Sequence, residues 1–203
     1  VLSDKLYAIG GYQDAVLNSV EVYDLNTRTW SEAASLKEAR RDFACVKVSD
    51  TQIAVIGGTG EGDVPLTSIE VFDGSNWMTL PVTLPEAYDY VKAVKVDDTH
   101  VWIIGAAWYK DETRHSVLKT EIRKFDMSTM SFDAEVIAAP AITARYDNFQ
   151  VVLQRRADGN YLVIADGIDA DYTICRKVDV VNVATGAVET TELTDARYNC
   201  AMI

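Results

Sequence analysis

Four short segments of this 203-residue chain carry the side chains best suited to hold another molecule. Each segment combines arginine or tyrosine with aspartate or asparagine, and each leads into an apolar stretch. Arginine and tyrosine are enriched among the residues that dominate the energy of protein interfaces. We therefore expect a binding surface made of Arg40, Arg41, Asp42, Tyr88, Asp89, Tyr90, Arg145, Tyr146, Asn148, Arg197, Tyr198 and Asn199.

A second set of loops is expected to extend this surface, at residues 12–14, 59–63, 108–111 and 169–172. Trp108 and Tyr109 lie on a predicted inserted loop, where core residues are not expected, so they are assigned to the same surface. An alternative stays open for the first set. Its arginines and aspartates could instead pair with each other or with neighbouring backbone and fix the packing of the fold.

The sequence predicts no metal site, no cofactor and no catalytic residue. The two histidines, His100 and His115, are separated in sequence and fall in different structural contexts. The aspartates of the loops do not follow the spacing of a calcium-binding loop. Motifs of serine hydrolases, zinc proteases and phosphate-binding loops are absent from the sequence.

Charge limits the class of partner. The formal net charge is −12 and the pI is about 4.5, so nucleic acids and anionic membrane surfaces are not expected to bind. No apolar run approaches the length that crosses a bilayer, so membrane insertion is not expected either. A protein partner remains, and the arginines would suit an acidic segment of it through charge-assisted hydrogen bonds.

The three cysteines, Cys45, Cys175 and Cys200, have no spacing typical of a disulfide framework or a zinc site. We expect free, buried thiols. This pattern and the absence of a glycosylation sequon slightly favour the cytoplasm over secretion, and the compartment otherwise stays open.

The elements that must position these residues form a repeat. A short apolar strand ends in glycine, a second strand ends in an aromatic residue followed by Asp, and a tryptophan follows, with a period of about 50 residues. Glycine is expected because the chain leaves the strand through backbone angles that a Cβ disfavours. The tryptophans are expected to pack between units. The repeat residues are Gly10, Gly11, Trp30, Gly57, Gly58, Trp77 and Gly105.

These residues resemble the kelch family of β-propellers. The resemblance implies an all-β fold with about four four-stranded blades, at approximately 5–35, 42–85, 89–140 and 147–195. The chain is expected to be a single propeller domain over 1–203 or a fragment of one. An inner strand such as 198–203 could complete the first blade, but the missing initial methionine and the apolar end favour a piece of a larger propeller.

The resemblance also implies a function. In kelch adaptors the same loops form the peptide-binding face, which points to a protein-interaction module without enzymatic activity. The adjacent Tyr-His pair of the related copper oxidases is absent. A carbohydrate-active enzyme or sugar-binding propeller, with Arg40, Arg145 and Arg197 holding an anionic sugar, is the alternative. A further alternative is that the chain is a structural component of a large assembly.

Overall fold

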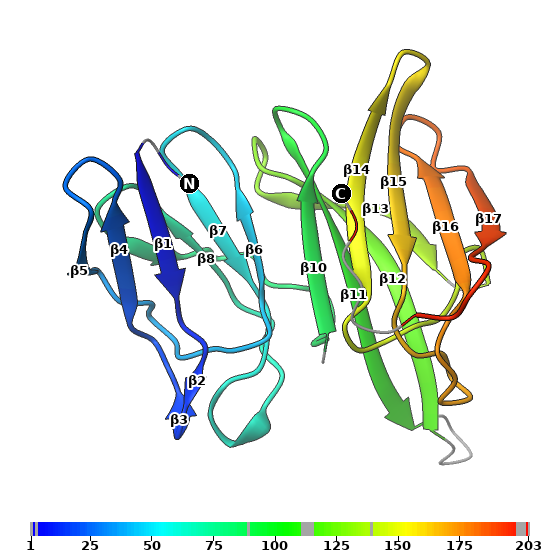
Figure 1. The fold of residues 1–203 in the computed structure, drawn as a ribbon, viewed down its shortest axis with the longest axis horizontal. Coiled ribbons are helices and arrows are strands. Elements are labelled where there is room, and N and C mark those ends of the chain that lie inside the picture. Colours follow the sequence, from blue (N-terminus) through cyan, green and yellow to red (C-terminus); the bar gives the residue numbers. More distant parts are fainter. Residues whose placement is uncertain are drawn as a thin grey trace. The chain divides into compact units, whose positions relative to one another are not determined.

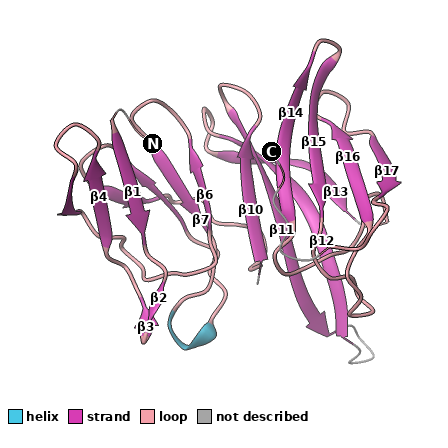
Figure 2. Ribbon diagram, in the orientation of Figure 1, coloured by secondary structure: helices cyan, strands magenta, loops and turns pink. Residues whose placement is uncertain are grey.

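The computed structural model describes Leu2, residues 4–88, 90–110, 116–138, 140–197 and Met202. Strands dominate this part of the chain, and its one helical element is the short 3-10 turn η1 (Glu61–Asp63) (Figure 2). The expected all-β class is confirmed. The chain divides into two compact units, Val1–Val91 and Lys92–Ile203, which are described separately below.

The first unit holds two antiparallel sheets (Figure 1). The first sheet has three strands in the order β1 (Lys5–Ile9), β4 (Val20–Asp24) and β5 (Thr29–Ala33), and a small hairpin joins β2 (Tyr12–Gln13) to β3 (Ala15–Val16). The second sheet has four, in the order β6 (Ala44–Lys47), β7 (Ile53–Ile56), β8 (Ile69–Phe72) and β9 (Trp77–Thr79). Strand order follows chain order, as expected of propeller blades.

Two more four-stranded sheets follow, and β10 begins at the boundary of the units. One has the order β10 (Tyr90–Lys95), β11 (His100–Lys110), β12 (Ser116–Asp126) and β13 (Ser131–Ala138). The other has the order β14 (Gln150–Arg156), β15 (Gly159–Ala165), β16 (Lys177–Asn182) and β17 (Val188–Glu192).

The strands β4, β8, β12 and β16 each end in a turn of one type. The carboxylate of Asp24 accepts hydrogen bonds from the backbone N–H groups of Asn26 and Thr27, at 2.8 and 3.1 Å. Asp73 holds Ser75 and Asn76 in the same way, both at 2.8 Å. Asp126 and Asn182 close the corresponding turns of the second unit. The residue after the aromatic position is therefore fixed by turn chemistry.

The core of the first unit lies between its two sheets. Val20 and Leu36 from the first sheet and its outgoing loop meet Ile53, Phe72 and Trp77 of the second sheet, and all five are buried. The rings of Phe72 and Trp77 lie 5.2 Å apart between centroids. Trp77 is thus an inter-sheet packing residue, as expected from the repeat.

Trp30 differs from this expectation. It occupies the same repeat position as Trp77, yet 51% of its surface is exposed against 1% for Trp77. It packs beside Tyr23 of the neighbouring strand, with 5.2 Å between ring centroids. The face of the first sheet that carries both rings is not covered by a second sheet within the described unit, which explains the exposure.

The glycine pairs behave as predicted in the first two repeats. Gly57 and Gly58 have φ angles of 59° and 89°, and a Cβ on Gly58 would lie 2.5 Å from the carbonyl oxygen of Arg41. Gly105 does not end its strand. Ala106 replaces the second glycine, so the chain stays extended and β11 continues to Lys110, paired along its length with β12.

The cysteines are free in the described residues, but only one is buried. Cys175 is buried as expected, whereas Cys45 is exposed. Side chains of β6 alternate between buried and exposed, and Cys45 falls on the exposed face of that strand. Cys200 lies outside the described residues.

Candidate functional site

The two sets of loops singled out from the sequence pair with each other in both units. In the first, Arg41 and Thr59 exchange backbone hydrogen bonds of 2.9 and 2.8 Å. In the second, Tyr146 and Ile168 do the same, at 2.9 Å in each direction. The loop that enters a sheet is therefore held against the loop that follows the glycine position, at one edge of each sheet.

In the first unit this edge forms a polar cluster, which we call the loop-edge cluster: Tyr12, Arg41, Asp42 and Asp63. The Arg41 guanidinium donates one hydrogen bond to Asp42 at 2.7 Å and another to Asp63 at 2.6 Å. Its Cζ lies 5.7 Å from the centroid of the Tyr12 ring, which is 64% exposed. Together with Gly11 these side chains line a cavity of about 510 Å³.

The charges of the loop-edge cluster are not balanced. The hydrogen bond to Asp63, together with the charges of Asp63 and Asp42, raises the pKa of Arg41, so its charge is permanent. Two carboxylates face this one guanidinium, and both are more exposed than it is. The cluster consequently offers an approaching molecule a net negative charge beside an aromatic face.

The corresponding edge of the second unit has the same character. Tyr146 and Tyr172 meet edge to face, with 6.3 Å between centroids, and Tyr172 is 74% exposed. Asn148 donates a hydrogen bond to Asp147 at 2.9 Å. The carboxylate of Asp169 holds the loop by accepting backbone hydrogen bonds from Asp171 and Thr173. Exposed aromatics beside carboxylates therefore recur at both edges.

Arg40 and Arg145 do not belong to this surface, contrary to expectation, because both are completely buried. Arg40 donates hydrogen bonds to the Gly57 carbonyl at 2.8 Å, to the Ser68 hydroxyl at 2.9 Å and to the Glu70 carboxylate at 2.7 Å. Glu70 is itself buried. Arg40 therefore follows the alternative expectation, in which an arginine of this loop fixes the packing of the fold.

Arg145 repeats this arrangement in the second unit. It donates hydrogen bonds to the Lys177 carbonyl at 3.0 Å and to the buried carboxylate of Asp179 at 2.5 Å. Asp179 also accepts the backbone N–H of Thr143 at 2.9 Å. A buried arginine thus ties the incoming loop to the third strand of the sheet in each unit.

The other predicted residues are dispersed. Tyr88 is buried, Tyr90 is half-buried at the start of β10, and Arg197 is exposed. Trp108 and Tyr109 lie in β11 rather than in a loop, and their side chains are outside the described part of the structure. Asp89, Tyr198 and Asn199 also lie outside it. Tyr12, Asp63 and Tyr172 belong to the second set of loops, at residues 12–14, 59–63 and 169–172, which the sequence led us to expect as an extension of this surface.

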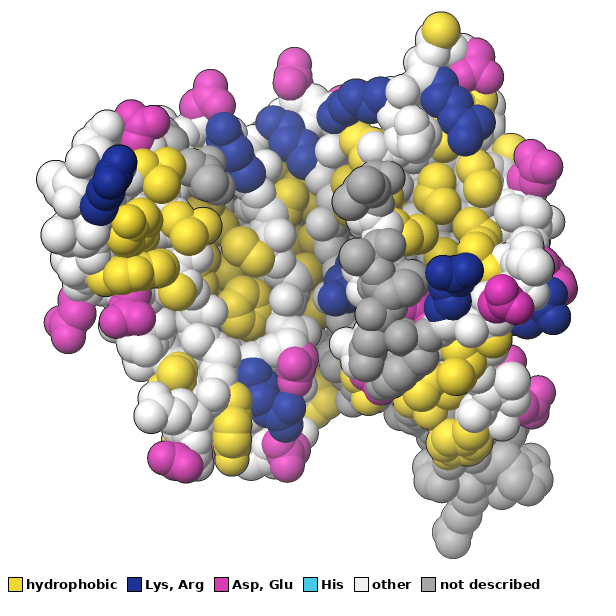
Figure 3. All heavy atoms as spheres, viewed as in Figure 1, with side chains coloured by type: hydrophobic (Ala, Val, Ile, Leu, Met, Phe, Trp, Pro, Cys, Tyr) yellow, Lys and Arg dark blue, Asp and Glu magenta, His cyan; other side chains and the backbone are white. Residues whose placement is uncertain are grey.

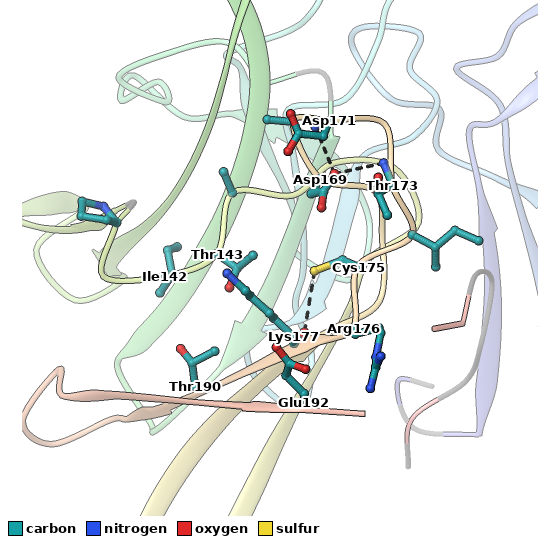
Figure 4. A pocket seen from close by; sticks show the side chains of 14 residues that line it. Ile142, Thr143, Asp169, Asp171, Thr173, Cys175, Arg176, Lys177, Thr190 and Glu192 are labelled. Atoms are coloured by element: carbon teal, nitrogen blue, oxygen red, sulfur yellow. Dashed lines mark hydrogen bonds between the residues drawn. The ribbon is translucent and has the colours of Figure 1, made fainter. Parts of the chain in front are cut away.

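A larger cavity, of about 770 Å³, lies beside the fourth sheet (Figure 4). Several of its polar groups already serve the fold: Asp169 binds backbone, and Arg176 donates two hydrogen bonds to the Leu193 carbonyl, at 3.1 and 2.9 Å. The Sγ atom of Cys175 lies 3.9 Å from the Lys177 carbonyl. These polar groups of the cavity therefore hold the loops of the fourth sheet in place.

The described residues contain neither a cluster of metal ligands nor a membrane-spanning helix. No three histidine, cysteine, aspartate or glutamate side chains converge there as metal ligands would. Nor does that part of the chain contain a helix with the length and apolar character needed to cross a membrane.

Comparison with known proteins agrees with the sheet architecture. Residues 1–37 match the Kelch motif. The repeats of this chain are kelch repeats. Human Kelch-like protein 34 is 30% identical over 143 residues, covering 68% of this chain and 21% of that protein. An F-box/kelch-repeat protein of Arabidopsis thaliana is 38% identical over 78 residues, covering 36% of this chain and 19% of its own.

Rat Kelch domain-containing protein 10 is a third kelch relative, 30% identical over 95 residues. Those residues cover 40% of this chain and 22% of that protein. The matched part of the kelch-repeat chain thus spans about a fifth of each of these relatives.

Proposed function

We propose that this kelch-repeat chain is a non-enzymatic protein-interaction module that binds a partner segment at the loop edges of its sheets. The observation that carries the proposal is the loop-edge cluster, where Tyr12, Arg41, Asp42 and Asp63 surround a cavity without being needed for the core. Large exposed aromatics with fixed neighbours are typical anchors of binding surfaces. Two of the relatives are named an F-box/kelch-repeat protein and a Kelch-like protein, and an interaction role is consistent with these names.

The charge of the loop edges favours a basic partner segment rather than the acidic one expected from the arginines. Arg40 and Arg145 are used inside the fold, and Arg41 is already bound by two carboxylates. The groups left for a partner are the exposed carboxylates and the tyrosine rings. A lysine or arginine side chain could stack on Tyr12 and pair with Asp63.

Burial of the same two arginines weighs against the sugar-binding alternative. That alternative relied on Arg40, Arg145 and Arg197 to hold an anionic sugar. Two of the three have no exposed surface, so they cannot contact a ligand while the sheets are intact. Arg197 alone does not make a sugar site.

The test is selection from a random displayed-peptide library against the purified chain. We expect enrichment of peptides with lysine or arginine next to an aromatic or aliphatic residue. Their affinity should fall at least about tenfold for Tyr12→Ala and for Asp63→Asn. Met78→Ala, which removes an exposed apolar side chain from β9, is the control and should leave the affinity unchanged. Acidic peptides, or binding insensitive to both loop variants, would contradict the proposal.

A further inference from the structure

The loop that enters the fourth sheet lacks an acidic residue that the equivalent loops have. Three of the four loops carry an acid two residues before their arginine or tyrosine, and they read Glu38-Ala39-Arg40, Glu86-Ala87-Tyr88 and Asp195-Ala196-Arg197. The loop into the fourth sheet reads Thr143-Ala144-Arg145. A carboxylate that this loop supplies in the other repeats is therefore absent here.

The second sheet shows what this carboxylate binds. Glu38 accepts a hydrogen bond from the Ser68 hydroxyl at 2.6 Å and a longer one, of 3.4 Å, from Arg40. Ser68 comes just before β8 and two residues before the buried Glu70. The acid of the loop is therefore held by the side chain that precedes this strand.

Lys177 is the equivalent of Ser68 in the fourth sheet. It lies two residues before the buried Asp179, and its carbonyl accepts a hydrogen bond from Arg145 at 3.0 Å. The Ser68 carbonyl accepts one from Arg40 in the same way, at 3.3 Å. In the fourth sheet an ammonium group thus replaces the hydroxyl that holds the acid, while the acid itself is absent.

The third sheet also has a lysine at this position, and that lysine is neutralised. Lys119 lies two residues before the buried Glu121 and pairs with its carboxylate at 3.0 Å. Asp179 is instead bound by Arg145. The Lys177 ammonium has no hydrogen-bond or ion-pair partner in the part of the chain that the structure describes. Lys177 is consequently a cation without its carboxylate.

This cation lines the cavity of about 770 Å³ beside the fourth sheet, a volume typical of small-molecule sites. Glu192 lines it too and stands directly opposite Lys177 in the register of β16 and β17. Opposite charges at such positions commonly pair, but no ion pair joins these two described side chains. In Figure 4 the Lys177 side chain extends away from β17 toward Thr143. The two charges therefore flank the cavity without neutralising each other.

The remaining charges of the cavity exclude a simple anion. The carboxylates of Asp169, Asp171 and Glu192 outnumber the cations of Arg176 and Lys177 along its wall. Figure 3 shows basic and acidic side chains interspersed over the second unit rather than gathered in patches of one sign. A ligand that brings a carboxylate to Lys177 must therefore carry a positive charge as well.

We infer that this cavity binds a small zwitterion of the class of aliphatic α-amino acids. The ligand carboxylate takes the place of the absent loop acid and accepts hydrogen bonds from Lys177, and the ligand ammonium donates to Glu192. Cβ atoms of opposite residues on neighbouring strands are about 4.5–5.5 Å apart, so both side chains can reach groups attached to a single carbon. Ile142 and Ile174 supply apolar wall for the aliphatic side chain. This site is separate from the loop-edge cluster of the first unit and does not depend on partner binding there.

Titration of the whole ¹⁵N-labelled chain with L-leucine tests the inference. We expect saturable changes in the ¹H–¹⁵N correlation spectrum, confined to amide signals of the residues around the cavity. N-acetyl-L-leucine lacks the ammonium, and L-leucinamide lacks the carboxylate. Each should bind at least about tenfold more weakly than L-leucine, because each loses one charge-assisted hydrogen bond.

Variants of the chain test the same two contacts from the protein side. Lys177→Met and Glu192→Gln should each weaken L-leucine binding at least about tenfold. Glu189→Gln is the matched control, because Glu189 is an exposed residue of β17 that makes the same change in charge but does not line the cavity. It should bind L-leucine like the unaltered chain. All three side chains are exposed, so the melting temperature should stay the same.

The absence of a saturable change with L-leucine would overturn the inference. So would equal affinities for L-leucine and N-acetyl-L-leucine, since the ligand ammonium would then have no role. Equal affinities of the Glu192→Gln and Glu189→Gln variants would likewise show that the cavity is not the place of binding.

Discussion

Replacement of Arg40 tests whether the adjacent arginines of the first unit have separate roles. Arg40→Ala removes the cation and leaves the buried Glu70 carboxylate with only the backbone N–H groups of Lys37 and Glu38, at 2.7 and 3.1 Å. Breaking a buried ion pair by removing one partner costs about 3–5 kcal/mol of folding free energy. For a chain of this size, that cost lowers the melting temperature by roughly 6–20 °C.

Arg41→Ala is the matched control, one residue away. Both carboxylates paired with Arg41 are well exposed, and pairs of this kind contribute about 0–1 kcal/mol. Its melting temperature should therefore stay within a few degrees of the unaltered chain. Differential scanning calorimetry, with urea unfolding followed by tryptophan fluorescence, measures both variants.

The pair itself is isolated by a double-mutant cycle. Arg40→Ala with Glu70→Ala should cost less than the sum of the single variants by about 0.5–3 kcal/mol, because the second substitution removes the charge left uncompensated by the first. Equal destabilisation by Arg40→Ala and Arg41→Ala, or strict additivity in the cycle, would refute the assignment of Arg40 to the core.

Three further predictions concern other parts of the kelch sheets. Gly58→Ala should lower the free energy of unfolding by a few kcal/mol, because the new Cβ would lie 2.5 Å from a backbone oxygen. Gly62 also has a positive φ but open space around it, so Gly62→Ala should cost only about 1 kcal/mol. Similar urea midpoints for the two variants would contradict this prediction. Native alkylation followed by mass spectrometry should label Cys45 before Cys175, and the reverse order would show that the exposure is wrong. The backbone N–H groups of its turn lower the pKa of Asp73, so the carboxylate stabilises the fold above the unfolded pKa of about 3.9, and this stabilisation is lost as pH falls through the folded pKa. In the Asp73→Asn variant the free energy of unfolding should therefore fall less steeply with acid pH. An unchanged pH profile of stability would contradict this role of Asp73.

The strands and turns of this chain follow from short stretches of its sequence. Gly57 and Gly58 leave their strand at positive φ, and Asp24 and Asp73 close their turns through their own neighbours. These are local effects that depend on residues a few positions away, so a repeat in the sequence is enough to reveal them. The prediction that a strand ends at Gly105 was wrong for an equally local reason. Ala106 stands in place of the second glycine, and β11 continues past Gly105.

Which of the repeated residues are exposed depends on the packing of distant parts of the chain. Arg40 and Arg41 are neighbours of one type, yet one is buried on Glu70 and the other lies at an exposed loop edge, because consecutive side chains turn to different sides of the chain. Trp30 and Trp77 have the same place in the repeat and opposite exposure. Burial depends on whether another sheet covers a face, which is a property of distant residues that no local pattern contains.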